Sequence, residues 1–294
     1  MYPIKVEINE ENILALTKLF KKTYTEVIAE IEGATDFGVY NRKQILKTIE
    51  TKLTDLGVDV DAFLKTELPN YYKSGADDAV KQLRNVGADV PIARGFNVLH
   101  QEAILALIDD TGKAFGEAIT GVQRSANLIL NKSVRDLITQ KLASGKIKGE
   151  AMREVKQSVI GILKDQGLSA IVDKSGRKWD LDRYTEMLFR TKAVEARNRG
   201  LANRMAQNDY DLVQVSDHQG ECELCTPWER RVLSLTGKTK GYPTVAEAEA
   251  EGLFHPNCRH AINVLVPELA EATKAYDPDT KTYVLSKEKI DSLM

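Results

Sequence analysis

The chain has 294 residues, 43% of them hydrophobic and 29% charged, with 19 glycines and 8 prolines, which allows one large domain or two ordinary ones. This composition excludes collagen-like and wholly disordered proteins. The first residues lack the apolar run of a secretion signal, and no window approaches the roughly 18 uncharged apolar residues of a membrane span. We therefore expect a protein made and kept in a cytosol, without a membrane partner.

The net charge is only −2, but the charges are unevenly placed along the chain. Residues 1–140 carry 17 Lys and Arg against 20 Asp and Glu, residues 141–204 carry 15 against 8, and residues 205–294 carry 9 against 15. The basic middle segment suits either a solvated helix face or a surface for nucleic acid or an acidic protein.

Apolar residues at helical spacing predict a helical region over residues 1–166. The expected helices span residues 10–31, 40–56, 60–87, 96–130, 133–142 and 149–163. Pro69 is expected to bend or restart the third helix. The glycines within 96–130 either break that helix or let another helix approach closely.

The pattern changes near Gly167, so residues 167–294 are expected to form a small α+β module. Alternating residues around Ser175-Gly176 predict a hairpin, and a helix should follow over residues 181–207. Short strands are expected at 212–216, 231–235 and 261–266, with a brief helix at 245–251 and a last hairpin around Pro278-Asp279. The expected fold class is α+β, with a mainly helical N-terminal part.

Four arginines recur every seven residues in the predicted helix 181–207: Arg183, Arg190, Arg197 and Arg204. Residues seven positions apart are rotated by only about 20° around a helix axis, so these arginines should form one stripe. We expect this arginine stripe on the outer face, because the same helix must bury Tyr184, Leu188 and Val194. The stripe either pairs locally with Glu186 or Glu195, or contributes to docking in an assembly.

Cysteine and histidine are concentrated in one stretch, because every one of the 3 Cys and 4 His except His100 lies between His218 and His260. Cys222 and Cys225 form a CxxC pair, and His255 and Cys258 form an HxxC pair after 29 intervening residues. Two such pairs predict a closed tetrahedral site of three sulfurs and one nitrogen, typical of structural zinc. His260 is the best substitute for His255 as the fourth ligand, and His218 is a weaker one.

Other readings of these residues remain open. The thiols could form a disulfide, which a cytosol disfavours, a thioredoxin-like redox pair, which Pro227 and the flanking strands disfavour, or no ligand set at all. Asp217-His218 with Asn257 is similar to the His-metal nuclease fingers, but here the pair precedes the first knuckle and no second carboxylate cluster follows. We expect no catalytic residue. His100 is expected to be packed or half exposed and to have no functional role, and Trp228 is expected to plug the small zinc region.

The segment from Leu168 to Pro267 resembles the minor head proteins of tailed bacteriophages, the Mu F-like and minor capsid families. The resemblance rests on DKSGRKWDLDRYTEMLFRTKAVEARNRG, on CxxCxPWER, and on YPTVAEAEAEGLFHPNCRH with the strand that follows. Arg230 departs from the Gly that often stands there in the family.

The resemblance implies a structural component at the portal vertex inside the phage head, assembled in the bacterial host cytoplasm. Its implied partners are the portal protein, coat or scaffolding protein, and packaged DNA bound without sequence preference. Relatives often carry an added C-terminal toxin or transferase domain; only about 30 residues follow His260, so we expect no enzyme attached. The alternatives are a zinc-finger nuclease or toxin-like enzyme acting on nucleic acid, and a non-viral DNA-binding module.

Overall fold

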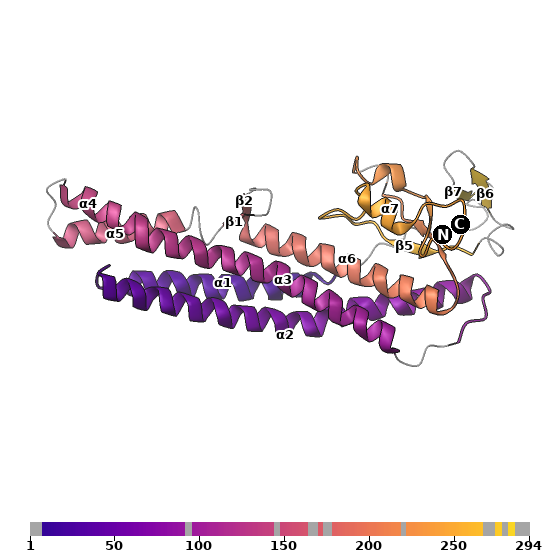
Figure 1. Cartoon of the computed structure of the whole chain (residues 1–294), viewed down its shortest axis with the longest axis horizontal. Coiled ribbons are helices and arrows are strands. Elements are labelled where there is room, and N and C mark those ends of the chain that lie inside the picture. Colours follow the sequence, from indigo (N-terminus) through magenta and orange to yellow (C-terminus); the bar gives the residue numbers. More distant parts are fainter. Residues whose placement is uncertain are drawn as a thin grey trace. The chain divides into compact units, whose positions relative to one another are not determined.

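The structure is a computed structural model that describes residues 8–91, 96–143, 148–163, 170–172, 178–218, 222–266, 274–277 and 282–285. These residues are mainly helical and include short antiparallel sheets, so the predicted α+β class is confirmed (Figure 1). None of the described helices combines the length and the apolar character that a membrane crossing needs.

The helices are α1 (Glu10–Gly33), α2 (Val39–Asn85), α3 (Val98–Leu128), α4 (Val134–Ala143), α5 (Lys148–Leu163), α6 (Leu181–Gln207) and α7 (Val245–Ala250). The strands are β1 (Ala170–Val172), β2 (Lys178–Asp180), β3 (Leu212–Val215), β4 (Val232–Ser234), β5 (Ile262–Val264), β6 (Lys274–Asp277) and β7 (Thr282–Leu285). The predicted helix 181–207 is confirmed at both ends.

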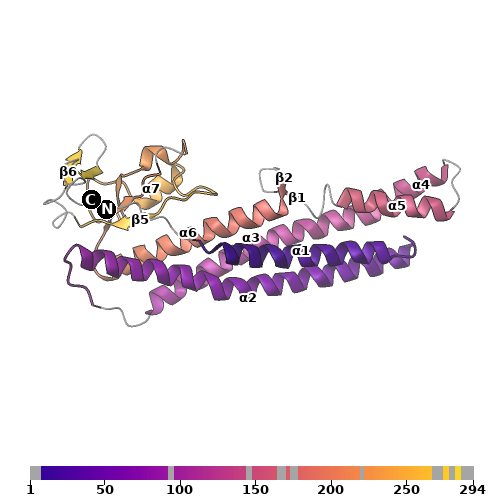
Figure 2. The same cartoon turned by 180° about the vertical axis from the view of Figure 1, so that it is seen from behind.

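The expected helix end at Gly57 is wrong, and the helix does not restart at Pro69. Helix α2 is continuous through Gly57 and Pro69, as its ribbon shows in Figure 2. The buried side chains Leu64, Leu68 and Tyr72 flank Pro69 and stabilise the helix by more than the one missing hydrogen bond costs. The glycines of α3 do not break it either, and a π-helical turn (Ile129–Ser133) leads directly from α3 into α4.

The described residues form two compact units that interleave along the sequence. The helical unit comprises Glu10–Lys65 and Ile108–Glu186, and the sheet unit comprises Met1–Asn9, Thr66–Leu107 and Met187–Met294. Helices α2, α3 and α6 contribute residues to both units. The predicted division into a helical region 1–166 and an α+β module 167–294 stays a prediction, and the compact units have other bounds.

The helical unit has an apolar core of helix side chains at the predicted spacings. Phe20 of α1 packs against Phe115 of α3 with ring centroids 5.8 Å apart, and Leu16 of α1 and Ile49 of α2 are fully buried. The predicted hairpin is confirmed by β1 and β2, which pair antiparallel from Ala170–Asp180 to Val172–Lys178. Its turn at Ser175-Gly176 lies outside the described residues.

The sheet unit is built on an antiparallel three-stranded sheet in the order β4-β3-β5. Its core joins sheet residues such as Val213 and Val264 to Leu83 of α2, Leu201 of α6 and Trp228. Trp228 is 5% exposed, so its expected role as a hydrophobic plug is confirmed. Strands β6 and β7 form the predicted last hairpin, whose Pro278-Asp279 turn lies outside the described residues.

Side chains from two helices cover the outer edge of β5. The guanidinium of Arg197 donates to the Ile262 carbonyl at 2.6 Å, and the Ile262 N–H donates to the Asn198 side chain at 3.3 Å. The Val264 N–H donates to the Gln82 side chain at 2.9 Å. On the opposite edge, the Ser234 N–H of β4 donates to the Pro243 carbonyl at 2.8 Å. Helix and loop groups therefore fix the sheet in place from both sides.

The expectation that the whole arginine stripe lies on the outer face is wrong. Arg197 and Arg204 are only 2% and 3% exposed, whereas Arg183 is exposed and Arg190 half-buried. Arg197 pairs with Asp78 at 3.0 Å, and Arg204 donates to Gln207 at 2.8 Å. Helix α6 is covered on more than one side within the sheet unit. The face that carries Arg197 and Arg204 can therefore be buried, because each guanidinium has a partner there.

Candidate metal centre

The two cysteine-containing pairs lie on two tight turns of the sheet unit. The N–H groups of Cys225 and Thr226 both donate to the Cys222 carbonyl, at 3.1 and 2.9 Å, and a 3-10 turn (Thr226–Trp228) follows. In the second turn, the Cys258 N–H donates to the His255 carbonyl at 2.9 Å. Each turn thus directs two ligand side chains to the same side, as expected for a metal knuckle.

The second turn is held in an unusual backbone conformation. Phe254 and Asn257 have φ angles of 61° and 67°, in the left-handed region that side chains other than glycine rarely adopt. The Asn257 N–H donates to the Thr191 hydroxyl of α6 at 3.0 Å, which helps to hold this turn. Such strain persists only where the surroundings hold the backbone in place.

The turns bring five predicted ligands together. Cys222 Sγ lies 2.9 Å from His255 Nε2, and Cys225 Sγ lies 3.5 Å from Cys258 Sγ. Cys258 Sγ lies 3.4 Å from His260 Nδ1. Their ligand atoms form two groups, Cys222 with Cys225 and His255, and Cys225 with Cys258 and His260, each within 4.8 Å of one another. Cys225 belongs to both groups and therefore stands at the middle of the site.

Both histidines are oriented for a metal. His255 Nδ1 lies 2.7 Å from the Pro256 carbonyl, and His260 Nε2 lies 2.9 Å from the Glu229 carboxylate. A carbonyl or carboxylate oxygen can only accept a hydrogen bond, so the ring protons belong on His255 Nδ1 and His260 Nε2. The other ring nitrogen of each histidine therefore presents its lone pair to a cysteine sulfur. The geometry therefore accommodates either His255 or His260 as the nitrogen ligand.

The cluster is chemically suited to a soft cation. Cys225 and Cys258 are 0% and 6% exposed, and all three cysteines are free thiols. Burial and the neighbouring sulfurs raise the pKa of Cys225. At Cys258 burial acts in the same direction, but the interactions with His260, whose backbone N–H donates to the sulfur at 3.4 Å, and with Cys225 outweigh it and lower the pKa. Sulfurs in a tetrahedral zinc site lie about 3.8 Å apart, given Zn–S bonds of about 2.3 Å. The spacing, donor types and outer hydrogen bonds thus fit zinc.

His218 lies beside this cluster and outside both ligand groups. Its ring packs on that of His260 with centroids 4.5 Å apart, and its Nε2 lies 3.2 Å from the Ser216 hydroxyl. The preceding Asp217 forms an ion pair with Arg230. This carboxylate is therefore engaged by a guanidinium.

Sequence reasoning missed Glu229. Its carboxylate accepts hydrogen bonds from the His218 backbone N–H at 3.0 Å and from the His260 ring. Its place directly after Trp228 is the only signal, because the CxxCxPW turn carries it back toward the second knuckle.

The comparisons with known proteins identify one family. A family model described as phage minor capsid protein 2 matches residues 31–292. No curated protein and no solved structure matches the chain. The match spans residues of both compact units, well beyond the metal centre.

Proposed function

The chain belongs to the phage minor capsid protein 2 family, and we propose that it works at the portal vertex inside the head of a tailed phage. Membership of this family makes it a structural protein of the phage particle. The finer placement, and kinship with the Mu F-like minor head proteins, is supported by the motifs between Leu168 and Pro267. A role in head assembly, DNA packaging or delivery is part of the same proposal.

We further propose that one zinc ion staples the sheet unit through Cys222, Cys225, Cys258 and either His255 or His260. When bound, zinc would supply a closed cross-link between two turns and no chemistry on a substrate. The chain's own residues prepare the site: Glu229 and the Pro256 carbonyl orient the rings, and the tight turns present the sulfurs. The observation that supports this proposal is the convergence of four ligand side chains, Cys222, His255, Cys258 and His260, on Cys225.

The packaged genome is a further proposed partner, contacted without sequence preference. The basic segment 141–204 supports it less strongly than its charge suggests, because Arg197 and Arg204 are buried. The exposed Arg183 remains available for a phosphate contact. Retention on DNA that falls steeply with salt concentration would support this contact, and salt-independent behaviour would contradict it.

The placement is tested by fractionating a phage that encodes the chain with a small peptide tag. Mass spectrometry of purified heads, tails and empty shells should find the chain in heads, and cross-linking should join it to the portal protein. A chain recovered only in tails would contradict the proposal. A plasmid-nicking assay with Mg²⁺, Mn²⁺ or Zn²⁺ tests the nuclease alternative; we expect no cleavage, and cleavage abolished by His218→Ala would favour it.

A further inference from the structure

The five ligand side chains of the metal centre differ in how deeply they are buried. One group, here called the outer group, joins the half-buried Cys222 and His255 to the buried Cys225. The other, the inner group, consists of Cys225, Cys258 and His260, all of which are buried. A tetrahedral site of three sulfurs and one nitrogen uses four of these five side chains, so one histidine is left over. The two histidines can be distinguished by their depth in the fold.

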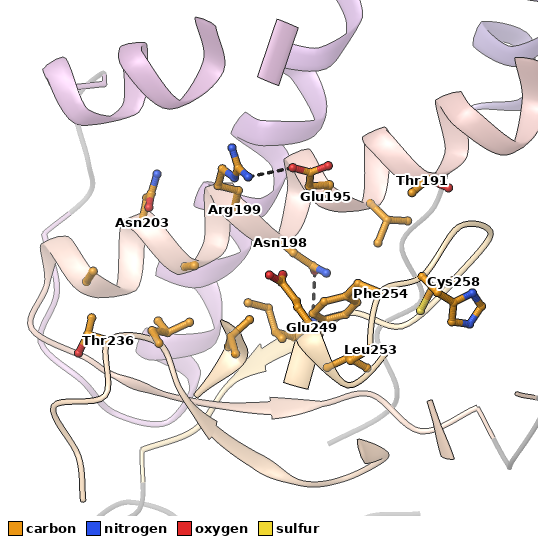
Figure 3. A pocket seen from close by; sticks show the side chains of 18 residues that line it. Thr191, Glu195, Asn198, Arg199, Asn203, Thr236, Glu249, Leu253, Phe254 and Cys258 are labelled. Atoms are coloured by element: carbon orange, nitrogen blue, oxygen red, sulfur yellow. Dashed lines mark hydrogen bonds and ion pairs between the residues drawn. The ribbon is translucent and has the colours of Figure 1, made fainter. Parts of the chain in front are cut away.

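A cavity gives access to one side of the metal centre. It has a volume of about 630 Å³ and lies between α6 and the segment that runs from α7 to Cys258 (Figure 3). In Figure 3, Cys258 lies at the end of the cavity opposite Thr236. His255 also lines the cavity, whereas His260 is not among the described residues that do. Exposed residues such as Arg199 belong to the same lining, so the cavity is open to water and provides the entry path that a metal site needs.

His260 is the better placed histidine for holding a metal. Its Nε2 lies 2.9 Å from the Glu229 carboxylate, which also accepts the His218 backbone N–H at 3.0 Å. The side chain of Glu229 is only 10% exposed, so these hydrogen bonds are shielded from water. A carboxylate behind a ligating imidazole fixes the ring and raises its basicity. The ring of His255 faces the carbonyl of the adjacent Pro256 instead, and a neutral acceptor raises the basicity of the ring less.

His255 is the better placed histidine for exchanging a metal. It lines the cavity, and its Nε2 lies 2.9 Å from Sγ of Cys222. Cys222 is half-buried, whereas the other two cysteines are buried. The pair of His255 and Cys222 is therefore reached from solvent more easily than His260, which is only 3% exposed.

We propose that His260 is the nitrogen ligand of the resting zinc site, that Glu229 is its positioning residue, and that His255 is a transfer ligand, which binds the metal only during entry and release through the cavity. The three cysteines complete the resting site. This inference rests on the zinc site proposed above and gives each histidine a separate role. Cys225 connects the two roles, because it belongs to both groups and its Sγ lies 3.5 Å from that of Cys258.

The assignment has a kinetic consequence. A side chain that contacts the metal only in transit speeds binding and release by the same factor, because both directions pass through the same arrangement. Its removal therefore slows both rates and leaves the dissociation constant unchanged. Removal of a resting ligand acts differently, because it weakens binding and makes release faster. The direction of the change in release rate thus distinguishes a transfer ligand from a resting ligand.

The test measures Zn²⁺ release from the full-length, zinc-loaded chain. Stopped-flow mixing with a chromogenic chelator gives the release rate, extrapolated to zero chelator, and equilibrium competition with the same chelator gives the dissociation constant. His255→Ala should slow release by about tenfold and leave the dissociation constant unchanged. His260→Ala should weaken binding by about 100-fold or more and speed release. In chains loaded with Co²⁺, the tetrahedral absorption bands should persist in His255→Ala and change in His260→Ala.

Glu229→Gln tests the positioning role. This variant keeps an acceptor behind the ring but loses the charge, so Zn²⁺ should bind about 10- to 100-fold more weakly. The matched control is Glu223→Gln, which removes the same charge from an exposed residue between Cys222 and Cys225 and should leave binding unchanged. In the His260→Ala background, Glu229→Gln should weaken binding no further, because Glu229 acts through that ring. A further loss there would assign Glu229 a merely structural role.

Faster release or weaker binding in His255→Ala would overturn the proposal, because His255 would then be a resting ligand. An unchanged release rate in that variant would overturn the transfer role. If His260→Ala does not fold, the release rate of His255→Ala still decides between the two histidines. A chain that binds no metal would overturn this inference together with the zinc site. A zinc-bound chain that shows the opposite rate changes would overturn this inference alone.

Discussion

Gly75 and Arg197 lie at a backbone contact between α2 and α6, because a Cβ built on Gly75 would lie 1.8 Å from the Arg197 carbonyl oxygen. The contact is reciprocal one turn further along, where a Cβ on Gly200 would lie 2.0 Å from the Tyr72 carbonyl oxygen. Each helix thus offers a glycine to the backbone of the other. This crossing sets the spacing of the two helices that cover the sheet.

Substituting either glycine should therefore separate the helices. Gly75→Ala and Gly200→Ala are each expected to destabilise the sheet unit by about 3 kcal/mol or more, since the obstacle is backbone and cannot rotate away. The matched control is Gly116→Ala in α3, where a Cβ meets nothing within 4 Å. That change should stabilise by up to about 1 kcal/mol through helix propensity. Urea unfolding measures all three, and equal effects would contradict the crossing.

Arg197 is expected to be a structural residue. Arg197→Met should cost about 2–3 kcal/mol, because it leaves the buried Ile262 carbonyl without its donor and the half-buried Asp78 without its ion-pair partner. Arg199→Met, on the exposed side of the same helix, should cost less than about 1 kcal/mol. A double-mutant cycle with Asp78→Asn should show clear non-additivity. An Arg197 variant with wild-type stability and poor head incorporation would instead restore the docking role.

One zinc ion should be found per chain purified without chelator. Cys225→Ser should abolish binding, since Cys225 belongs to both ligand groups, whereas Thr226→Ser next to it should not. Hydrogen exchange of the Cys225 variant should lose protection in β3–β5 and also around Leu201 and Met205, which share the same core. Elemental analysis without metal, with three freely reactive thiols, would contradict the site.

His100 sits in a hydrogen-bonded chain with one consistent direction. Gln207 Oε1 accepts from Arg204 at 2.8 Å and from His100 Nε2 at 3.0 Å, so His100 Nδ1 accepts the Tyr72 hydroxyl at 2.9 Å. Asn203 donates to the Tyr72 oxygen at 2.7 Å. His100 is fully buried, as expected, and the chain is complete only while its ring is neutral.

This arrangement predicts a pH dependence of stability. Burial lowers the pKa of His100 in spite of its bond to Gln207, and the charge of Arg204 lowers it further. As the pH falls below about 6.5, His100 takes up a proton in the unfolded chain but stays neutral in the folded chain. The contribution of His100 to the free energy of unfolding is therefore fully present above that pH and is lost below it. His100→Gln should flatten this part of the urea-midpoint profile. An unchanged slope would assign the acid sensitivity to the other histidines.

Local sequence signals predicted the elements well, whereas partners distant along the chain could not be read from them. Asp180 accepts the N–H groups of Asp182 and Arg183 and so begins α6 where the polar start of the pattern indicated. The inward position of Arg197 depends on Asp78, 119 residues away. Periodicity places residues on one face of a helix, but it does not say how many faces the fold will cover.

The same limit applies to the metal centre. Spacing within each turn predicted the ligand pairs, because a knuckle is a local structure. Glu229 as the partner of His260 could not be predicted, since their contact spans 31 residues and depends on how the two turns meet.

The covered edges of the β4-β3-β5 sheet bear on how the chain behaves when many copies are crowded together. An uncovered strand edge pairs readily with a strand of another molecule and seeds aggregates. Here Gln82, Arg197 and Asn198 occupy the outer bonds of β5, and the Pro243 carbonyl holds Ser234 of β4. These contacts therefore oppose edge-to-edge pairing of the β4-β3-β5 sheets of two copies of the chain.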